Sequence, residues 1–142
     1  MSLSQIKSIC EEYPNLGVNG FMSVPCSADV AADNLHGLLQ SIDDINFVAG
    51  WLCGVEKTKT ISMRCSIGYA LKYIEPKSPK KHLSDGVFIV GAIIAGFVFV
   101  RSHNGNGPNV YFNMSCKSIA RKSGKPLPFE VGYSAISLAR GM

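Results

Sequence analysis

The stretch that decides the fold runs from Ile61 to Ser115 and reads ISMRCSIGYALKYIEPKSPKKHLSDGVFIVGAIIAGFVFVRSHNGNGPNVYFNMS. Apolar residues recur at helical spacing as far as Ile74, and Pro76 follows, which predicts a helix that ends there. A basic loop, a very apolar helix and a hairpin come next in the sequence. This order of elements is the order found in the second half of a winged-helix unit.

The apolar run over residues 86–100 contains no charged side chain. A helix that spans a bilayer needs roughly 20 residues, and residues 97–100 have the composition of a strand rather than of a helix. We therefore predict a buried helix over 86–95 and a strand after it, with no membrane span. The Asn-Gly-Asn-Gly sequence at 104–107 is a turn signal that leads into a second strand over 109–114.

Outside this stretch the sequence predicts further short helices. One covers residues 2–13, a second begins after Ser27, and a third is capped by Asp43 or Asp44. We expect Ser62 to cap the helix that ends at Ile74. The remaining expected elements are a short strand over residues 20–24, a helix that starts at Ser115 or Ser118, and a short helix around 135–138. The fold class expected is α+β, mainly helical with five to six helices, with a β-hairpin in the C-terminal half, and winged-helix-like. At 142 residues, the chain is expected to form a single domain over 1–142.

The charges are unevenly distributed along the chain. Residues 1–56 hold seven acidic side chains and one basic, a net charge of −6, whereas residues 57–142 hold thirteen basic and three acidic, a net charge of +10. Such asymmetry suggests that one face receives a polyanion or an acidic partner. The alternative is that the acidic half and the basic half attract each other across the fold.

The five cysteines are an odd number, and they include no CxxC pair. Each lies among apolar neighbours, as small buried side chains do. This pattern favours reduced thiols in the cytoplasm over a disulfide framework or a zinc cluster. The N-terminal residues are polar, which also favours a cytoplasmic protein without a signal peptide.

Signatures of catalysis are missing from the sequence. There is no GxSxG, HExxH or Walker motif, and the glycines of 104–107 belong to a hairpin turn rather than to a phosphate-binding loop. Pro126 follows the Arg-Lys-Ser-Gly-Lys sequence at 121–125 and prevents the helix that a P-loop needs. We therefore predict a protein that is not an enzyme and that has no metal site and no cofactor.

The middle third of the chain resembles a group of short, uncharacterised bacterial proteins that tend to occur with plasmids and phages. The residues that carry the resemblance are SIGYALKYIE at 66–75, SDGVFI at 84–89, AIIAGF at 92–97 and NVYFNMS at 109–115. The resemblance implies an accessory role in a mobile element. It implies no activity and no functional residue.

The basic half favours association with nucleic acid, because flexible cations on loops suit contacts with phosphates. The predicted contact residues lie on a loop, a wing and a tail: Lys77, Lys80, Lys81, His82, Arg101, His103, Asn104, Lys117, Arg121, Lys122 and Lys125. The helix in the position of a recognition helix has no hydrogen-bonding side chain after Asp85, so it cannot read base edges. Binding would therefore be to the DNA or RNA backbone, with low sequence specificity.

A second hypothesis is a protein-binding inhibitor of the anti-defence type. Its acidic half would mimic nucleic acid in the basic groove of a host nucleoprotein. The residues expected to do so are Glu11, Glu12, Asp29, Asp33, Asp43 and Asp44. The very apolar helix could alternatively pack in the core of a homodimer.

Overall fold

The computed structural model describes residues 3–22, 26–105 and 107–124. Within these ranges the fold is α+β and mainly helical, as predicted, with six helices of eight or more residues and two antiparallel hairpins. The elements are α1 (Leu3–Glu12), β1 (Leu16–Gly17), β2 (Gly20–Phe21), α2 (Ala28–Gln40), α3 (Ile42–Leu52), α4 (Ile67–Ile74), the 3-10 turn η1 (Glu75–Lys77), α5 (Asp85–Ile94), β3 (Phe99–Arg101), α6 (Ser102–Gly105), β4 (Val110–Phe112) and α7 (Cys116–Ser123). The helix expected around 135–138 and the end of the strand expected over 20–24 lie outside the described residues.

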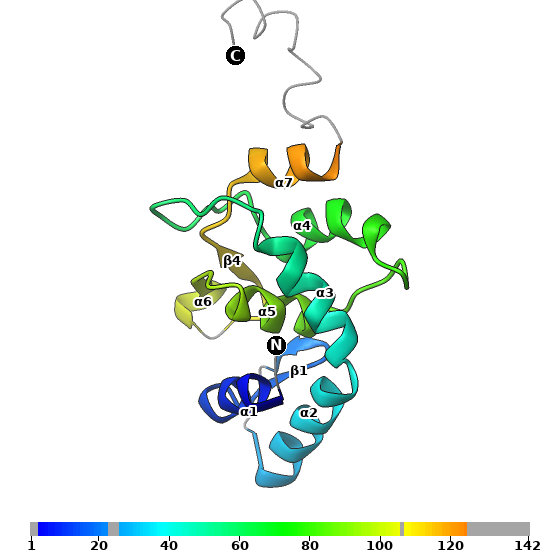
Figure 1. Ribbon diagram of the computed structural model, residues 1–142. Coiled ribbons are helices and arrows are strands. Elements are labelled where there is room, and N and C mark those ends of the chain that lie inside the picture. Colours follow the sequence, from blue (N-terminus) through cyan, green and yellow to red (C-terminus); the bar gives the residue numbers. More distant parts are fainter. Residues whose placement is uncertain (1–2, 23–25, 106, 125–142) are drawn as a thin grey trace, which may run out of the picture.

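The helix α5 lies at the centre of the molecule, between the lower helices α1 and α2 and the upper helices α4 and α7 (Figure 1). Every residue from Gly86 to Ala92 is buried. Its main neighbour is α3, and Gly91 allows the close approach because an added Cβ would lie 2.5 Å from Val48 Cγ1. This confirms an interior helix. Because its own chain covers Gly86 to Ala92, this part of α5 is not available to a second copy, and the possible homodimer stays a prediction.

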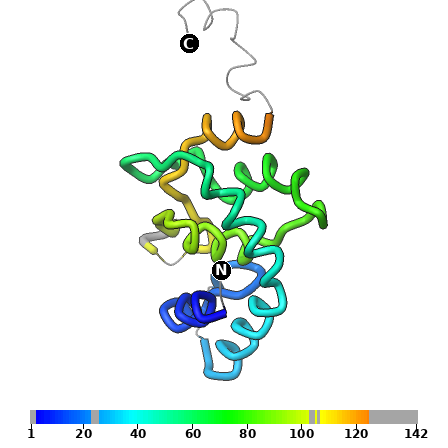
Figure 2. The backbone as a smooth tube through the Cα atoms, in the orientation of Figure 1, coloured from blue at the N-terminus to red at the C-terminus, as the bar shows by residue number. Residues whose placement is uncertain are grey.

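The chain starts at the lower end with α1 and α2, rises through α3, and reaches α4 and α7 at the upper end (Figure 2). The N-terminal hairpin pairs Leu16 with Phe21 and lies against α5. At that point Gly86 N–H donates to the carbonyl oxygen of Val18 at 2.8 Å. A Cβ on Gly86 would collide with the Gly17 carbonyl group, so this contact requires a glycine.

The hairpin of the C-terminal half is present, with β3 and β4 antiparallel and Phe99 opposite Phe112. Its connection is wider than the two-residue turn that the Asn-Gly pairs suggest, because Ser102–Gly105 form the single helical turn α6. The other edge of β4 is occupied by the segment before α4. Ser62 N–H donates to the Phe112 carbonyl at 2.9 Å, and Ser66 forms a bridge with Tyr111.

Two expected helix starts are wrong. The helix α4 begins at Ile67 and is capped by Ser66, whose hydroxyl accepts the Tyr69 N–H at 3.3 Å. Ser62 instead bonds to β4, which leaves Met63 outside the helix and 66% exposed. The helix α3 begins one residue before Asp43, so both aspartates lie in its first turn and neither is the capping residue. Their negative charge there interacts favourably with the helix dipole.

Three other caps match the sequence. Ser27 accepts the Val30 N–H at the start of α2, and Ser115 accepts the Ser118 N–H at the start of α7. The helix α5 is followed by Gly96, whose φ of +93° is the left-handed conformation that commonly ends a helix. Among the described residues, no helix combines the length and the apolar character needed to cross a membrane.

Candidate nucleic-acid interface

The folded chain separates its charges in part, because Lys7 lies on the acidic helix α1 and Glu56 lies beside the start of the basic helix α7. The lower helices α1 and α2 carry four of the acidic residues, and the upper helices α4 and α7 carry four cations (Figure 1). The acidic residues are Glu11, Glu12, Asp29 and Asp33, and the cations are Lys72, Lys117, Arg121 and Lys122. The asymmetry seen along the sequence is therefore also an asymmetry in space.

The helix α7 is amphipathic, and its outer face is basic. Ser118, Ile119, Ala120 and Ser123 are buried, whereas Lys117, Arg121 and Lys122 are exposed. Within the described part of the chain, none of these three cations has a carboxylate within ion-pair distance. Arg121 and Lys122 also lie in the last turn, where positive charge is favoured by the helix dipole.

Three contacts hold α7 in place. Ser115 N–H donates to the Glu56 carbonyl at 3.0 Å, and Glu56 N–H donates to the buried hydroxyl of Ser118 at 2.9 Å. At the other end of the helix, Lys122 Nζ lies 5.3 Å from the centroid of the Trp51 ring, at the end of α3. These contacts keep the basic face on the outside of the molecule.

Sequence reasoning missed two cations near α7. The helix α4 packs against α7, and Lys72 on α4 lies over the Tyr69 ring. Arg64, which precedes α4, is exposed as well. We name the five exposed cations Arg64, Lys72, Lys117, Arg121 and Lys122 the basic end.

Three side chains of the predicted loop at 77–82 contact other residues of the same chain. Lys80 Nζ pairs with Asp44 Oδ2 at 3.2 Å, and Lys81 Nζ donates to the Pro76 carbonyl at 2.6 Å. His82 Nδ1 lies 3.3 Å from Glu75 Oε2. The ion pair between Lys80 and Asp44 joins the basic half of the chain to the acidic half. The alternative drawn from the sequence, that the two halves attract each other, therefore holds at this position. Lys77 is exposed and has no carboxylate within ion-pair distance in the described ranges.

The predicted wing does not carry Arg101 at its tip. The guanidinium carbon of Arg101 lies 4.1 Å from the centroid of the Phe21 ring, and Nε donates to the Gly107 carbonyl at 2.8 Å. Burial lowers the pKa of Arg101 from its ordinary value. His103 and Asn104 belong to α6, and only their backbone is described; Lys125 lies outside the described residues. The structure therefore separates Arg101 from the cations of α7.

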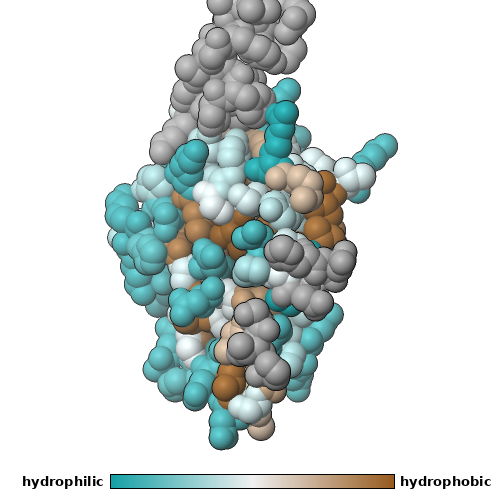
Figure 3. All heavy atoms as spheres, turned by 180° about the vertical axis from the view of Figure 1, so that it is seen from behind, coloured by the Kyte–Doolittle hydropathy of each residue, from teal (hydrophilic) through white to brown (hydrophobic). Residues whose placement is uncertain are grey.

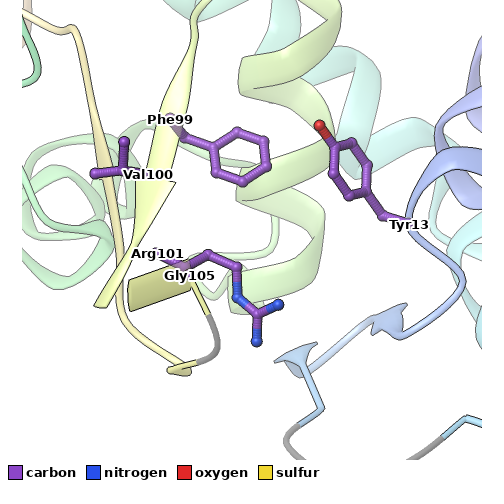
Figure 4. A pocket seen from close by; sticks show the side chains of 5 residues that line it. All are labelled: Tyr13, Phe99, Val100, Arg101 and Gly105. Carbon is purple, nitrogen blue, oxygen red and sulfur yellow. The ribbon is translucent and has the colours of Figure 1, made fainter. Parts of the chain in front are cut away.

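Arg101 instead lines a pocket of about 520 Å³, together with Tyr13, Phe99, Val100 and Gly105 (Figure 4). Tyr13 reaches into it from the end of α1, opposite Phe99 and Arg101 of β3. The ring centroids of Tyr13 and Phe99 are 5.5 Å apart. Burial and the neighbouring Glu12 carboxylate raise the pKa of Tyr13.

The acidic residues of the second hypothesis are mostly on the surface. Glu11, Glu12, Asp29, Asp33 and Asp43 are exposed, whereas Asp44 is partly buried and forms an ion pair with Lys80.

The face turned away in Figure 1 shows apolar side chains among hydrophilic ones (Figure 3). Exposed apolar side chains of the described residues include Val98 and Val100 of the β3 region, at 58% and 45% exposure.

The thiols are reduced, but they are not all buried. Cys10 and Cys65 are buried as expected, Cys26 and Cys116 are partly exposed, and Cys53 is exposed because it follows the last residue of α3. Within the described ranges, no group of three or more His, Cys, Asp or Glu side chains is placed to hold a metal ion.

Comparison with known proteins gives no match: no family model, no curated protein and no solved structure is similar to the chain. The resemblance of the middle third to plasmid- and phage-associated proteins therefore stays a prediction.

Proposed function

We propose that the protein binds nucleic acid through the phosphate backbone at its basic end, as a non-enzymatic accessory protein of a mobile element. The observation that supports the proposal most is the outer face of α7. It carries Lys117, Arg121 and Lys122, and none of them is ion-paired within the described residues. The acidic helices α1 and α2 lie at the opposite end, where they repel the polyanion least (Figure 1).

Binding at this site would be weakly sequence-specific. Lysine and arginine side chains that neutralise phosphates gain free energy mainly by releasing counterions, which depends on salt and not on base sequence. Reading base edges needs hydrogen-bonding side chains on an element that enters a groove. The interior helix α5 cannot enter one, because Gly86 to Ala92 are buried by the rest of the chain.

The test compares the double variants Lys117→Gln/Arg121→Gln and Lys80→Gln/Lys81→Gln with the wild type. Affinity for a random-sequence DNA duplex is measured by fluorescence anisotropy at several salt concentrations, and an RNA duplex of the same sequence is measured in parallel. We expect the α7 variant to bind about tenfold more weakly and to lower the slope of log K against log salt by about 2. The matched loop variant removes the same charge but should lose much less affinity, because Lys80 and Lys81 already have partners.

Equal losses in the two variants would argue against a site on α7 and for attraction by net charge alone. No binding by the wild type would reject the proposal. The alternative is then a protein inhibitor that presents acidic residues to a host nucleoprotein, and the exposure of Glu11, Glu12, Asp29, Asp33 and Asp43 supports it. A partner retained from a nuclease-treated host lysate, and lost with Asp29→Asn/Asp33→Asn, would favour that alternative.

A further inference from the structure

Two thiols lie where the start of α4 and the start of α7 meet. Cys65 precedes Ser66, the capping residue of α4, and is fully buried at 0% exposure. Cys116 is the first residue of α7 and is partly exposed. The two cysteines are far apart in the sequence, so the fold alone brings them together.

The surrounding backbone fixes this meeting point. Ser66 forms a bridge with Tyr111, and Ser62 N–H donates to the Phe112 carbonyl at 2.9 Å. Ser62 contacts both cysteines: its carbonyl accepts the backbone N–H of Cys65 at 3.1 Å, and its hydroxyl oxygen lies 3.9 Å from Cys116 Sγ. Burial raises the pKa of the Cys65 thiol, and the neighbouring Cys116 raises that pKa further.

We propose that Cys65 and Cys116 form a reversible disulfide when the protein meets hydrogen peroxide, and that this bond ties α7 to the start of α4. The inference depends only on the closeness of the two cysteines around Ser62, so it can be tested separately from nucleic-acid binding. Neither cysteine is disulfide-bonded in the structure.

The chemistry is a two-electron oxidation in two steps. The sulfur of Cys116, the more exposed of the two, attacks one oxygen of hydrogen peroxide; the O–O bond breaks, and a sulfenic acid and one water are formed. The sulfur of Cys65 then attacks the sulfenic sulfur, the S–O bond breaks, and the departing hydroxide takes the Cys65 proton as a second water. Burial raises the pKa of the Cys65 thiol and so slows the second step, and its closeness to Cys116 makes that step possible.

The bond would have a structural effect. It closes a loop that runs from residue 65 to residue 116 and so removes conformational freedom from the unfolded chain. For a chain of this size we expect Tm to rise by roughly 5–10 °C on oxidation and to return on addition of dithiothreitol.

Trypsin provides a direct readout in the full-length protein. Cleavage after lysine and arginine places Cys65 in the peptide 65–72 and Cys116 in the peptide 102–117, whereas Cys10, Cys26 and Cys53 share the peptide 8–57. After mild peroxide treatment and alkylation of the remaining thiols, we expect mass spectrometry to find 65–72 joined to 102–117, with two hydrogens fewer than the sum of the separate peptides.

Two variants control the experiment. Cys53→Ser removes an exposed thiol and should leave the cross-link and the Tm shift unchanged. Cys65→Ala should abolish both and leave Cys116 as sulfenic or more highly oxidised acid; the reduced variant's circular dichroism spectrum shows whether it folds. The proposal is overturned if wild-type 102–117 is oxidised without being joined to 65–72, or if it joins 8–57 as readily. If the cross-link forms but the Tm of the wild type does not change, the claim that the disulfide ties α7 to the start of α4 is wrong.

Discussion

The helices α5 and α7 belong to the same half of the chain but differ in how much of their surface is buried. In α5 seven residues in a row are buried, from Gly86 to Ala92, and the helix forms the centre of the core. In α7 only one side is buried, and the other carries Lys117, Arg121 and Lys122. In a winged-helix unit the element in the position of α5 would face DNA. Here it holds the fold together, and the cations lie on the helix after the hairpin, so the order of elements does not locate the interface.

The first prediction tests whether α5 is the packed centre, and it carries the largest expected effect. In Gly86→Ala the added methyl group would collide with the Gly17 carbonyl group. This group belongs to the backbone, so it cannot shift without a large energetic cost. The hydrogen bond from Gly86 N–H to the Val18 carbonyl would be strained as well. We expect the free energy of unfolding, measured by urea denaturation, to fall by about 3 kcal/mol.

Gly50→Ala is the matched control, because Gly50 lies in α3 and its added Cβ would meet nothing within 4 Å. Alanine in an exposed helical position should stabilise the protein by up to about 1 kcal/mol. If Gly86→Ala were as well tolerated as Gly50→Ala, α5 would not be packed against the N-terminal hairpin in solution.

The second prediction concerns how α7 is attached. Ile119 is fully buried, and truncation to alanine should cost about 2–4 kcal/mol through lost contacts and a cavity. Because α7 has only eight residues and is buried on one side only, we expect its amides to lose protection from hydrogen exchange before those of α5 do. Lys117→Ala, on the exposed side of α7, should change the stability by less than about 0.5 kcal/mol. Equal loss of protection in α5 and α7 would mean that the two helices unfold as one unit.

The same contrast explains what could be predicted from the sequence. The interior helix was predicted because its signal is local: an unbroken apolar run that contains no charged side chain. The start of α4 was predicted wrongly, because Ser62 and Ser66 are equally good caps by local pattern. The bond that decides between them joins Ser62 to Phe112, fifty residues further along the chain.

The candidate site shows the same limit. The cations of α7 were predicted from composition, since a cationic segment without acids is visible in any reading of the sequence. The position of Arg101 was not, because it depends on the Phe21 ring, which comes from the N-terminal hairpin. The partner of Lys80 was also hidden, since Asp44 lies thirty-six residues earlier. Contacts between distant segments leave no local pattern, so a charged loop and a neutralised loop look alike in sequence.

The smallest expected effect belongs to that pair, and it bears directly on which surface is basic. The Lys80 side chain is 65% exposed and the Asp44 side chain 17%, so solvent screens their attraction. A double-mutant cycle with Lys80→Ala and Asp44→Asn should give a coupling energy of about 0.2–1 kcal/mol by urea denaturation. The stability effect is small, but Asp44→Asn also removes the partner of Lys80 and should raise nucleic-acid affinity slightly if the loop can then reach phosphates. If Asp44→Asn leaves the affinity unchanged while Lys117→Gln/Arg121→Gln clearly lowers it, α7 is the contact surface. The loop at 77–82 then contributes to the fold and not to binding.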